Sequence, residues 1–193
     1  MRFTVFAQLL VLAPLAQSFV IPKGTEDGVY VVHTDEHGQE VHEKLGSVPT
    51  SDDIRLFEER DVVSPNSALM PRDRGSDYFC GCNNKMNHAH CDAAVKALKA
   101  DVTNKKGIFP ARSSFYAIHQ SVVAFVCNRG ETFGWAPGNM AGYFAGITDR
   151  CGWYIAGTHS TWDGKLHALV GYMNYRSGLD FCKASDSSPQ HSC

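Results

Sequence analysis

All seven cysteines of this 193-residue chain lie at or beyond residue 80, which predicts that only the C-terminal part is covalently cross-linked. At the other end, Arg2 precedes an apolar stretch over residues 5–15, and small residues follow as far as Ser18. This pattern is typical of a secretory signal peptide over residues 1–18, with cleavage after Ser18, and the stretch is too short to cross a bilayer. We therefore expect a secreted, extracellular protein, because an oxidising compartment lets cysteines pair.

An odd number of cysteines leaves one without an intramolecular partner, and the spacing alone does not decide the pairing. Cys193 ends a serine-rich tail, so we expect it to be the unpaired cysteine, with an intermolecular disulfide as one of its options. The other six are then the predicted disulfide cysteines: Cys80, Cys82, Cys91, Cys127, Cys151 and Cys182.

Charge divides the chain at about the same place as the cysteines do. Residues 19–74 carry six Lys or Arg against twelve Asp or Glu, a balance of −6, whereas residues 75–193 carry eleven against eight, a balance of +3. Such an asymmetry favours an acidic pro-segment ahead of a folded domain. We place the pro-segment and linker at residues 19–76, largely disordered, and the disulfide-stabilised domain at residues 77–193.

Two features lie within the acidic segment. Residues 28–33 (GVYVVH) resemble a strand and are followed by a turn-like cluster, so the segment holds a hairpin at most. Arg60, Arg72 and Arg74 are positions where a protease that prefers basic residues could cut.

The cross-linked part shows helical and strand patterns in alternation. Apolar residues recur at helical spacing over residues 91–102, with Asn87 as the predicted cap, and again from Met140 to Cys151, with Asn139 and Gly152 as the predicted caps. Strands are predicted at residues 121–127, 153–158 and 166–175, with a hairpin turn at Asp163 and Gly164. This order predicts an α+β fold, in which two helices pack on one face of a small antiparallel sheet.

Three segments carry a resemblance to a known group of proteins: SVVAFVCN at residues 121–128, ITDRCGWYIAGT at residues 147–158, and VGYMNY at residues 170–175 before Cys182. In their order and cysteine spacing, residues 78–182 resemble the secreted fungal proteins grouped around the smut virally encoded killer toxin. They are also similar to the necrosis-inducing extracellular effector domain of filamentous fungi.

The resemblance implies an α/β sandwich exported by a fungal cell, acting as a killer-type toxin or a host-directed effector and not as an enzyme. Its expected partner is a protein or surface component of a host or competitor cell, with no cofactor, no nucleic acid and no stable membrane insertion. The chain has fewer cysteines in its body than the killer toxin and adds an acidic segment, so the toxin's ion-channel target is not carried over.

An alternative from another class is a secreted, nuclease-like hydrolase that uses histidine and aspartate for acid–base chemistry. The candidate residues are His119, His159, Asp163 and His167, and the hypothesis requires them to converge in one cleft. His159 and His167 flank the predicted hairpin turn, so their side chains could approach one another across it. No serine elbow or metal-binding helix motif accompanies the set.

A metal site is an alternative interpretation of His88, His90 and Cys91 (HAHC), because imidazole and thiolate suit zinc. The spacing is not that of common structural zinc sites, so we expect solvated histidines at a helix start and no metal. Among the aromatic residues, Trp162 and Trp135 are the predicted partner contacts. A rigidly projecting loop with either tryptophan would favour a secreted inhibitor or cell-wall protein instead.

Overall fold

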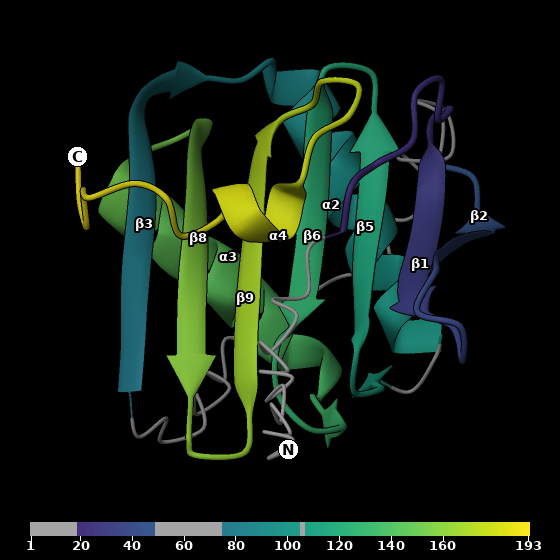
Figure 1. Ribbon diagram of the computed structural model, residues 1–193. Coiled ribbons are helices and arrows are strands. Elements are labelled where there is room, and N and C mark those ends of the chain that lie inside the picture. Colours follow the sequence, from purple (N-terminus) through teal and green to yellow (C-terminus); the bar gives the residue numbers. More distant parts are fainter. Residues whose placement is uncertain (1–18, 49–74, 105–106) are drawn as a thin grey trace, which may run out of the picture.

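One antiparallel sheet of seven strands organises the computed structural model, which describes residues 19–48, 75–104 and 107–193. The strand order is β2-β1-β5-β6-β9-β8-β3, and a two-stranded ribbon of β4 and β7 lies beside the sheet (Figure 1). The sheet strands are β1 (Gly28–Thr34), β2 (Glu40–Gly46), β3 (Gly75–Lys85), β5 (Ser113–His119), β6 (Val122–Asn128), β8 (Ile155–Trp162) and β9 (His167–Asn174). The other elements are β4 (Ile108–Phe109), β7 (Phe133–Gly134) and the helices α2 (His88–Asn104), α3 (Pro137–Cys151) and α4 (Phe181–Ala184).

The central strands β5 and β6 are buried along nearly their whole length because both faces of the sheet are covered. Every residue of β6 is buried, and β5 is buried up to its last residue. Strands covered on both faces do not alternate apolar with polar side chains, as half-exposed antiparallel strands do. The continuous run SVVAFVC therefore predicts a central strand, and β6 confirms it.

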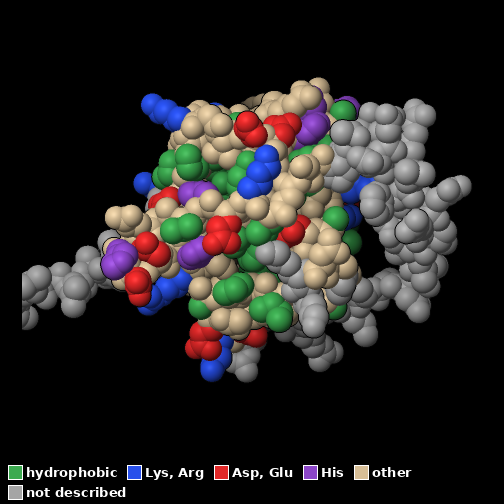
Figure 2. All heavy atoms as spheres, turned by 90° about the vertical axis from the view of Figure 1, so that its right-hand side faces the viewer, with side chains coloured by type: hydrophobic (Ala, Val, Ile, Leu, Met, Phe, Trp, Pro, Cys, Tyr) green, Lys and Arg blue, Asp and Glu red, His purple; other side chains and the backbone are tan. Residues whose placement is uncertain are grey.

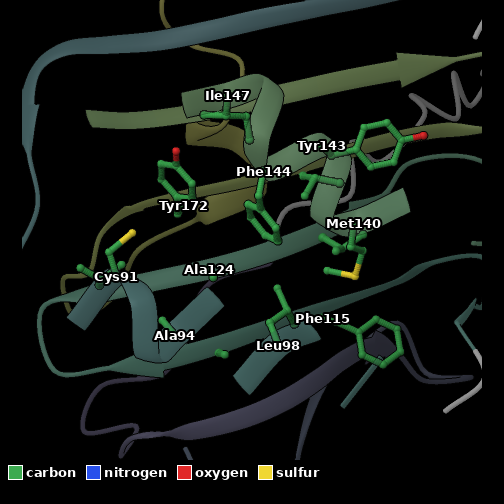
Figure 3. Packing of buried hydrophobic residues seen from close by; sticks show 14 of the residues in the cluster. Cys91, Ala94, Leu98, Phe115, Ala124, Met140, Tyr143, Phe144, Ile147 and Tyr172 are labelled. Carbon is green, nitrogen blue, oxygen red and sulfur yellow. The ribbon is translucent and has the colours of Figure 1, made fainter. Parts of the chain in front are cut away.

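Helices α2 and α3 cover one face of the sheet, behind it in Figure 1. Figure 3 shows their apolar side chains between the two helices and the strands. The close approach of α3 depends on Gly157 of β8, because a Cβ there would lie 2.6 Å from Ile147 and 2.9 Å from the sulfur of Cys151. The labelled core residues in Figure 3 are Cys91, Ala94 and Leu98 of α2, Met140, Tyr143, Phe144 and Ile147 of α3, and Phe115, Ala124 and Tyr172 of the strands.

The ends of these helices follow the predicted caps at two of three positions. The side chain of Asn87 accepts a hydrogen bond from the backbone N–H of His90 at 3.1 Å. Gly152 ends α3 with a φ of 95°, a left-handed conformation that favours glycine, and donates to the carbonyl of Thr148. The predicted cap at Asn139 is wrong, because α3 begins earlier, with Ala136 as its N-cap. A proline suits the first turn of the helix, where a backbone N–H would have no acceptor within the helix.

The opposite face of the sheet, here the front face, is covered by α4 and by the two ends of the described chain. Phe19 and Ile21 are 1% and 0% exposed, and they pack in one cluster with Leu179 and Phe181. The backbone N–H of Ile21 donates to the carbonyl of Leu179 at 3.0 Å, so the two segments hold each other across the sheet (Figure 1).

Residues 19–48 thus belong to the folded domain, so the prediction of a largely disordered pro-segment is wrong for this part of residues 19–76, and the domain begins before residue 77. Residues 49–74 lie outside the described residues. β1 pairs with β5 over six residues, with Tyr30 opposite Tyr116, and inserts between β5 and β2. Residues 28–33 are predicted to resemble a strand, but the partner strand lies about 85 positions away, beyond the reach of a local pattern. The predicted leader at residues 1–18 and cleavage positions Arg60, Arg72 and Arg74 lie outside the described residues.

The α+β class and the disulfide stabilisation are confirmed, but the finer prediction of a small sheet with two helices is wrong. The sheet has seven strands because β5 adds to the three strands predicted for the domain and β1, β2 and β3 extend it at both edges. A third helix, α4, lies on the front face. At the β2 edge, Figure 2 shows acidic, basic and histidine side chains mixed together, a composition that discourages pairing with another chain. No helix in the described ranges combines the length and apolar character needed to span a membrane.

Three disulfides connect the front face and the helix layer to the sheet. Cys80–Cys151 joins β3 to the end of α3, Cys127–Cys182 joins β6 to α4, and Cys82–Cys193 joins β3 to the last residue of the chain. Their Cα–Cα distances of 5.2, 5.8 and 5.5 Å lie in the normal range for disulfides.

The predicted role of Cys193 as the unpaired cysteine is wrong, and so is the predicted disulfide at Cys91. Cys91 is the free cysteine and is buried against the core from α2. Cys193 reaches Cys82 because the C-terminal tail crosses to β3, where the N–H of Cys80 donates to the carbonyl of Gln190 at 2.7 Å. A proposal of an intermolecular disulfide through Cys193 is therefore not maintained.

Candidate binding site

A groove of about 320 Å³ lies on the front face between the C-terminal tail and strands β3, β8 and β9. We call it the front groove. Its floor is the sheet, where Gly81, Ala156 and Thr158 place little side-chain bulk above the backbone. The residues around it are Phe79, Asn84, Gly157, Met173, Asn174, Arg176, Leu179, Ala184, Ser185, Ser187 and Ser188.

The wall formed by the tail is fixed at both ends by covalent bonds. Cys182 at one end is bonded to β6, and Cys193 at the other end is bonded to β3. Between them, the hydroxyl of Ser188 donates to the carbonyl of Cys80 at 2.7 Å, so the tail is also hydrogen-bonded to the strand that it crosses. Asp186 pairs with Arg129 at the end of β6. The groove is therefore shaped before any ligand arrives, which lowers the entropic cost of binding.

The chemistry of the front groove is polar with one charge. Arg176 is exposed and is the one charged residue among those that line it. The amides of Asn84 and Asn174 lie on the same rim, and the Asn174 amide donates to the carbonyl of Lys85 at 3.2 Å. A guanidinium beside amides and hydroxyls suits an anionic or hydrogen-bond-accepting group, with Phe79 and Met173 offering apolar contact.

The residues of the hydrolase alternative do not converge. His159 is buried on the helix side of β8, where it stacks on Tyr143 with the ring centroids 4.8 Å apart. His119 lies at the end of β5, and the order β5-β6-β9-β8 puts three strand spacings, about 14 Å, between it and β8. Its Nδ1 lies 3.1 Å from a carboxylate oxygen of Asp27.

The other two members of that set are also placed apart. Trp162 lies three residues after His159 in β8, so its side chain points to the opposite face of the sheet, the front face. His167 is paired with Trp162 in β9, so the side chain of His167 also lies on the front face. Asp163 lies in the turn itself and accepts hydrogen bonds there, 2.9 Å from the backbone nitrogen of Leu166. The expected approach of His159 and His167 across the hairpin is therefore wrong, because the two face opposite sides of the sheet.

The tryptophans divide by exposure in an order that the sequence did not indicate. Trp135, predicted as a partner contact, is 5% exposed and packs on Tyr143 and the aromatic rings of the β4–β7 ribbon, so it is not a contact surface. Trp162 is 42% exposed at the end of β8, and Trp153 is 77% exposed. Trp153 directly follows Gly152, which ends α3. This position after a helix end is the sequence feature that could have indicated its exposure.

The HAHC segment forms the first turn of α2 and contacts aromatic and hydroxyl groups. His88 stacks on Tyr154 at 3.9 Å between ring centroids, and Nδ1 of His90 lies 2.8 Å from the hydroxyl of Ser121. Cys80 and Cys82, which lie upstream of this segment in the sequence, are in disulfides and offer no thiolate for a metal. Within the described ranges, no group of three or more His, Cys, Asp or Glu residues is placed to hold a metal ion.

Because two partly buried histidines have lowered pKa values, we expect the free energy of unfolding to fall in mild acid. Burial lowers the pKa of His42, although the hydrogen bond that its ring donates to the carboxylate of Glu40 raises it. Burial and then the charge of Arg129 lower the pKa of His167. Below the ordinary value of about 6.5 the unfolded chain binds these protons before the folded chain does, so the free energy of unfolding decreases as pH falls. Urea unfolding at pH 7.5 and 5.5 should show a lower midpoint at pH 5.5.

The matched control for this prediction is the double variant His42→Gln, His167→Gln, measured at the same two pH values. Its midpoint should change less between them than that of the wild-type protein. An equal or larger change in the variant would show that other groups carry the pH dependence.

Comparisons with known proteins add no relative to this description. No protein-family model matches the chain, and neither a curated protein nor a solved structure matches it significantly. The functional argument therefore depends on the front groove, the exposed side chains and the sequence features.

Proposed function

We propose that the chain is an exported, disulfide-stabilised protein that acts by binding, as a fungal effector or a killer-type toxin directed at a host or competitor cell. The observation that carries the proposal is the front groove, a preformed cavity with Arg176 on its rim and a wall tied down at both ends by disulfides. The leader-like segment at residues 1–18 supports export. The three disulfides agree with it, because disulfides form and persist in oxidising compartments.

The partner that fits the front groove is a protein or surface component that presents an anionic or carbonyl-rich group. Arg176 would make the charge-assisted hydrogen bonds, while Asn84 and Asn174 would select for polar neighbours. His119, His159 and His167 lie apart and do not line one cleft, so we do not propose the hydrolase alternative.

The test uses the purified mature protein, labelled with a fluorophore and applied to plant tissue, insect cells and competing fungi. We expect saturable binding to at least one of them, and Arg176→Ala should weaken it roughly tenfold to 100-fold, as expected for the loss of a hydrogen bond from a charged group. Lys99→Ala is the matched control, because it removes one positive charge from α2, which covers the opposite face of the sheet from the front groove.

Two outcomes would contradict the proposal. One is that the wild-type protein neither binds nor harms any of the three targets. The other is that Arg176→Ala and Lys99→Ala weaken binding equally, which would indicate a general charge effect and not the front groove.

A further inference from the structure

A second cavity, of about 150 Å³, lies on the helix side of the sheet, between α2, the C-terminal half of α3 and the segment that follows α3. We call it the aromatic pocket. Four of its lining residues are aromatic: Phe144 of α3, Tyr172 of β9, and the consecutive pair Trp153 and Tyr154 that follows α3. Figure 3 shows Phe144, Tyr172 and Cys91 near one another between the helices and the sheet. The pocket is on the opposite face from the front groove, so the inference does not rest on the proposed function.

The rings form walls at the base and at the mouth. Phe144 and Tyr172 are nearly parallel, at 11°, with their centroids 5.8 Å apart. Trp153 and Tyr154 meet at 48° with centroids 6.0 Å apart, and Trp153 is 77% exposed. A large apolar ring left in water at the mouth of an aromatic pocket marks a surface available for contact.

The loop that carries the two outer rings is held in place by specific contacts. Gly152 and Tyr154 both have positive φ, 95° and 56°, which turns the chain back toward α2 directly after the helix. Tyr154 is then held by His88, which stacks on its ring, and by Asp92, whose carboxylate accepts a hydrogen bond from its hydroxyl at 3.1 Å. A positive φ at tyrosine is uncommon, so surrounding contacts must stabilise this turn.

Charge decides which ligands suit the aromatic pocket. Asp92 is the one charged residue among those that line it. Burial and then the charge of Asp92 raise the pKa of Cys91 to about 12, and burial raises the pKa of Tyr172 to about 12. The pKa of Tyr154 is also raised by burial and then by Asp92. These groups stay neutral at pH 7. Burial disfavours a charge of either sign, so the negative charge of Asp92 is the feature that opposes an anionic ligand and favours a cationic one.

We propose that the aromatic pocket binds a small organic cation of the trimethylammonium class, with its methyl groups against the rings and its charge balanced by Asp92. Ring faces attract cations through their quadrupoles, and aromatic walls around one carboxylate are a recurring solution for quaternary ammonium groups, which cannot donate hydrogen bonds. The volume of about 150 Å³ admits such a head group and excludes a folded polymer segment. Cys91 contributes a polarisable wall at the base.

The experiment titrates choline into the full mature protein and follows tryptophan fluorescence and calorimetric heat. Its neutral isostere 3,3-dimethyl-1-butanol has the same shape without the charge, and we expect it to bind at least threefold more weakly. Trp153→Ala and Asp92→Asn should each weaken choline binding by fivefold or more. Trp162→Ala is the matched control, since it removes another exposed tryptophan outside the pocket, and it should bind choline as the wild-type protein does.

A second arm distinguishes the two sources of the same head group. Co-sedimentation with phosphatidylcholine vesicles, but not with phosphatidylglycerol vesicles, would support a lipid source, and choline binding without co-sedimentation would support a free small molecule. The proposal is overturned if choline shows no saturable binding, if the isostere binds equally well, or if Trp153→Ala binds as the wild-type protein does. Circular dichroism of each variant verifies that a loss of binding is not a loss of fold.

Discussion

Replacing Cys80 and Cys151 together by alanine should lower the free energy of unfolding by about 4 kcal/mol. The bond closes a loop with a sequence separation of 71, and loops of that size restrict the unfolded chain strongly. It also joins the edge strand β3 to α3, and β3 has a neighbouring strand on one side only. Urea unfolding without reductant, compared between wild-type protein and the double variant, measures the difference.

The matched control is Cys91→Ala, which removes a buried sulfur that forms no disulfide. It should cost about 1 kcal/mol, a usual value for a small loss of core packing. Thiol titration of the denatured wild-type protein should find one free thiol per chain. A Cys91→Ala cost equal to that of the double variant, or three free thiols, would contradict the assigned disulfides.

A chain that begins at Gly75 should fail to fold, although it retains every cysteine and therefore all three disulfide pairs. The deletion removes the buried side chains of Phe19, Ile21, Val29 and Val32. Losing a large buried apolar side chain costs about 2 to 5 kcal/mol, and a domain's whole stability is about 5 to 15 kcal/mol. The deletion also leaves the backbone of β5 without its partner β1.

The measurement is a proton–nitrogen NMR spectrum of the purified fragment beside that of the chain over residues 19–193. We expect the fragment to show collapsed signals or to aggregate, and the longer chain to show dispersed signals. The control is the longer chain cut at a protease site introduced between residues 49 and 74, because it retains β1 and β2 without their covalent link to β3. A dispersed spectrum and an unchanged Tm for the fragment would restore the interpretation of residues 19–48 as a dispensable pro-segment.

The local elements were predictable because each is encoded by neighbouring residues. Helical spacing of apolar residues identified α2 and most of α3, and the Asn87 cap follows from side-chain chemistry at one helix start. The β-branched run of β6 and the turn between β8 and β9 were recognised in the same way. These patterns repeat within a few residues, so no distant contact is needed to detect them.

The candidate site was far less predictable. Arg176 is a single charge after a strand and carries no motif, and it matters only because the tail from Cys182 to Cys193 returns beside it. Trp135, a predicted partner contact, is buried, whereas Trp153, for which no specific prediction follows from the sequence, is exposed, because exposure depends on which surface covers a ring. His159 and His167 are eight positions apart, yet strand register sends them to opposite faces of the sheet.

Composition and short-range periodicity are enough to show that the C-terminal part is cross-linked and that helices alternate with apolar strands. Three outcomes are visible only in the folded chain: β1 joins β5, Cys82 pairs with Cys193 and leaves Cys91 free, and a groove and an aromatic pocket form on opposite faces. These outcomes depend on contacts between residues far apart in the chain. Their entropic cost and packing gain are set by the whole fold and not by any local segment.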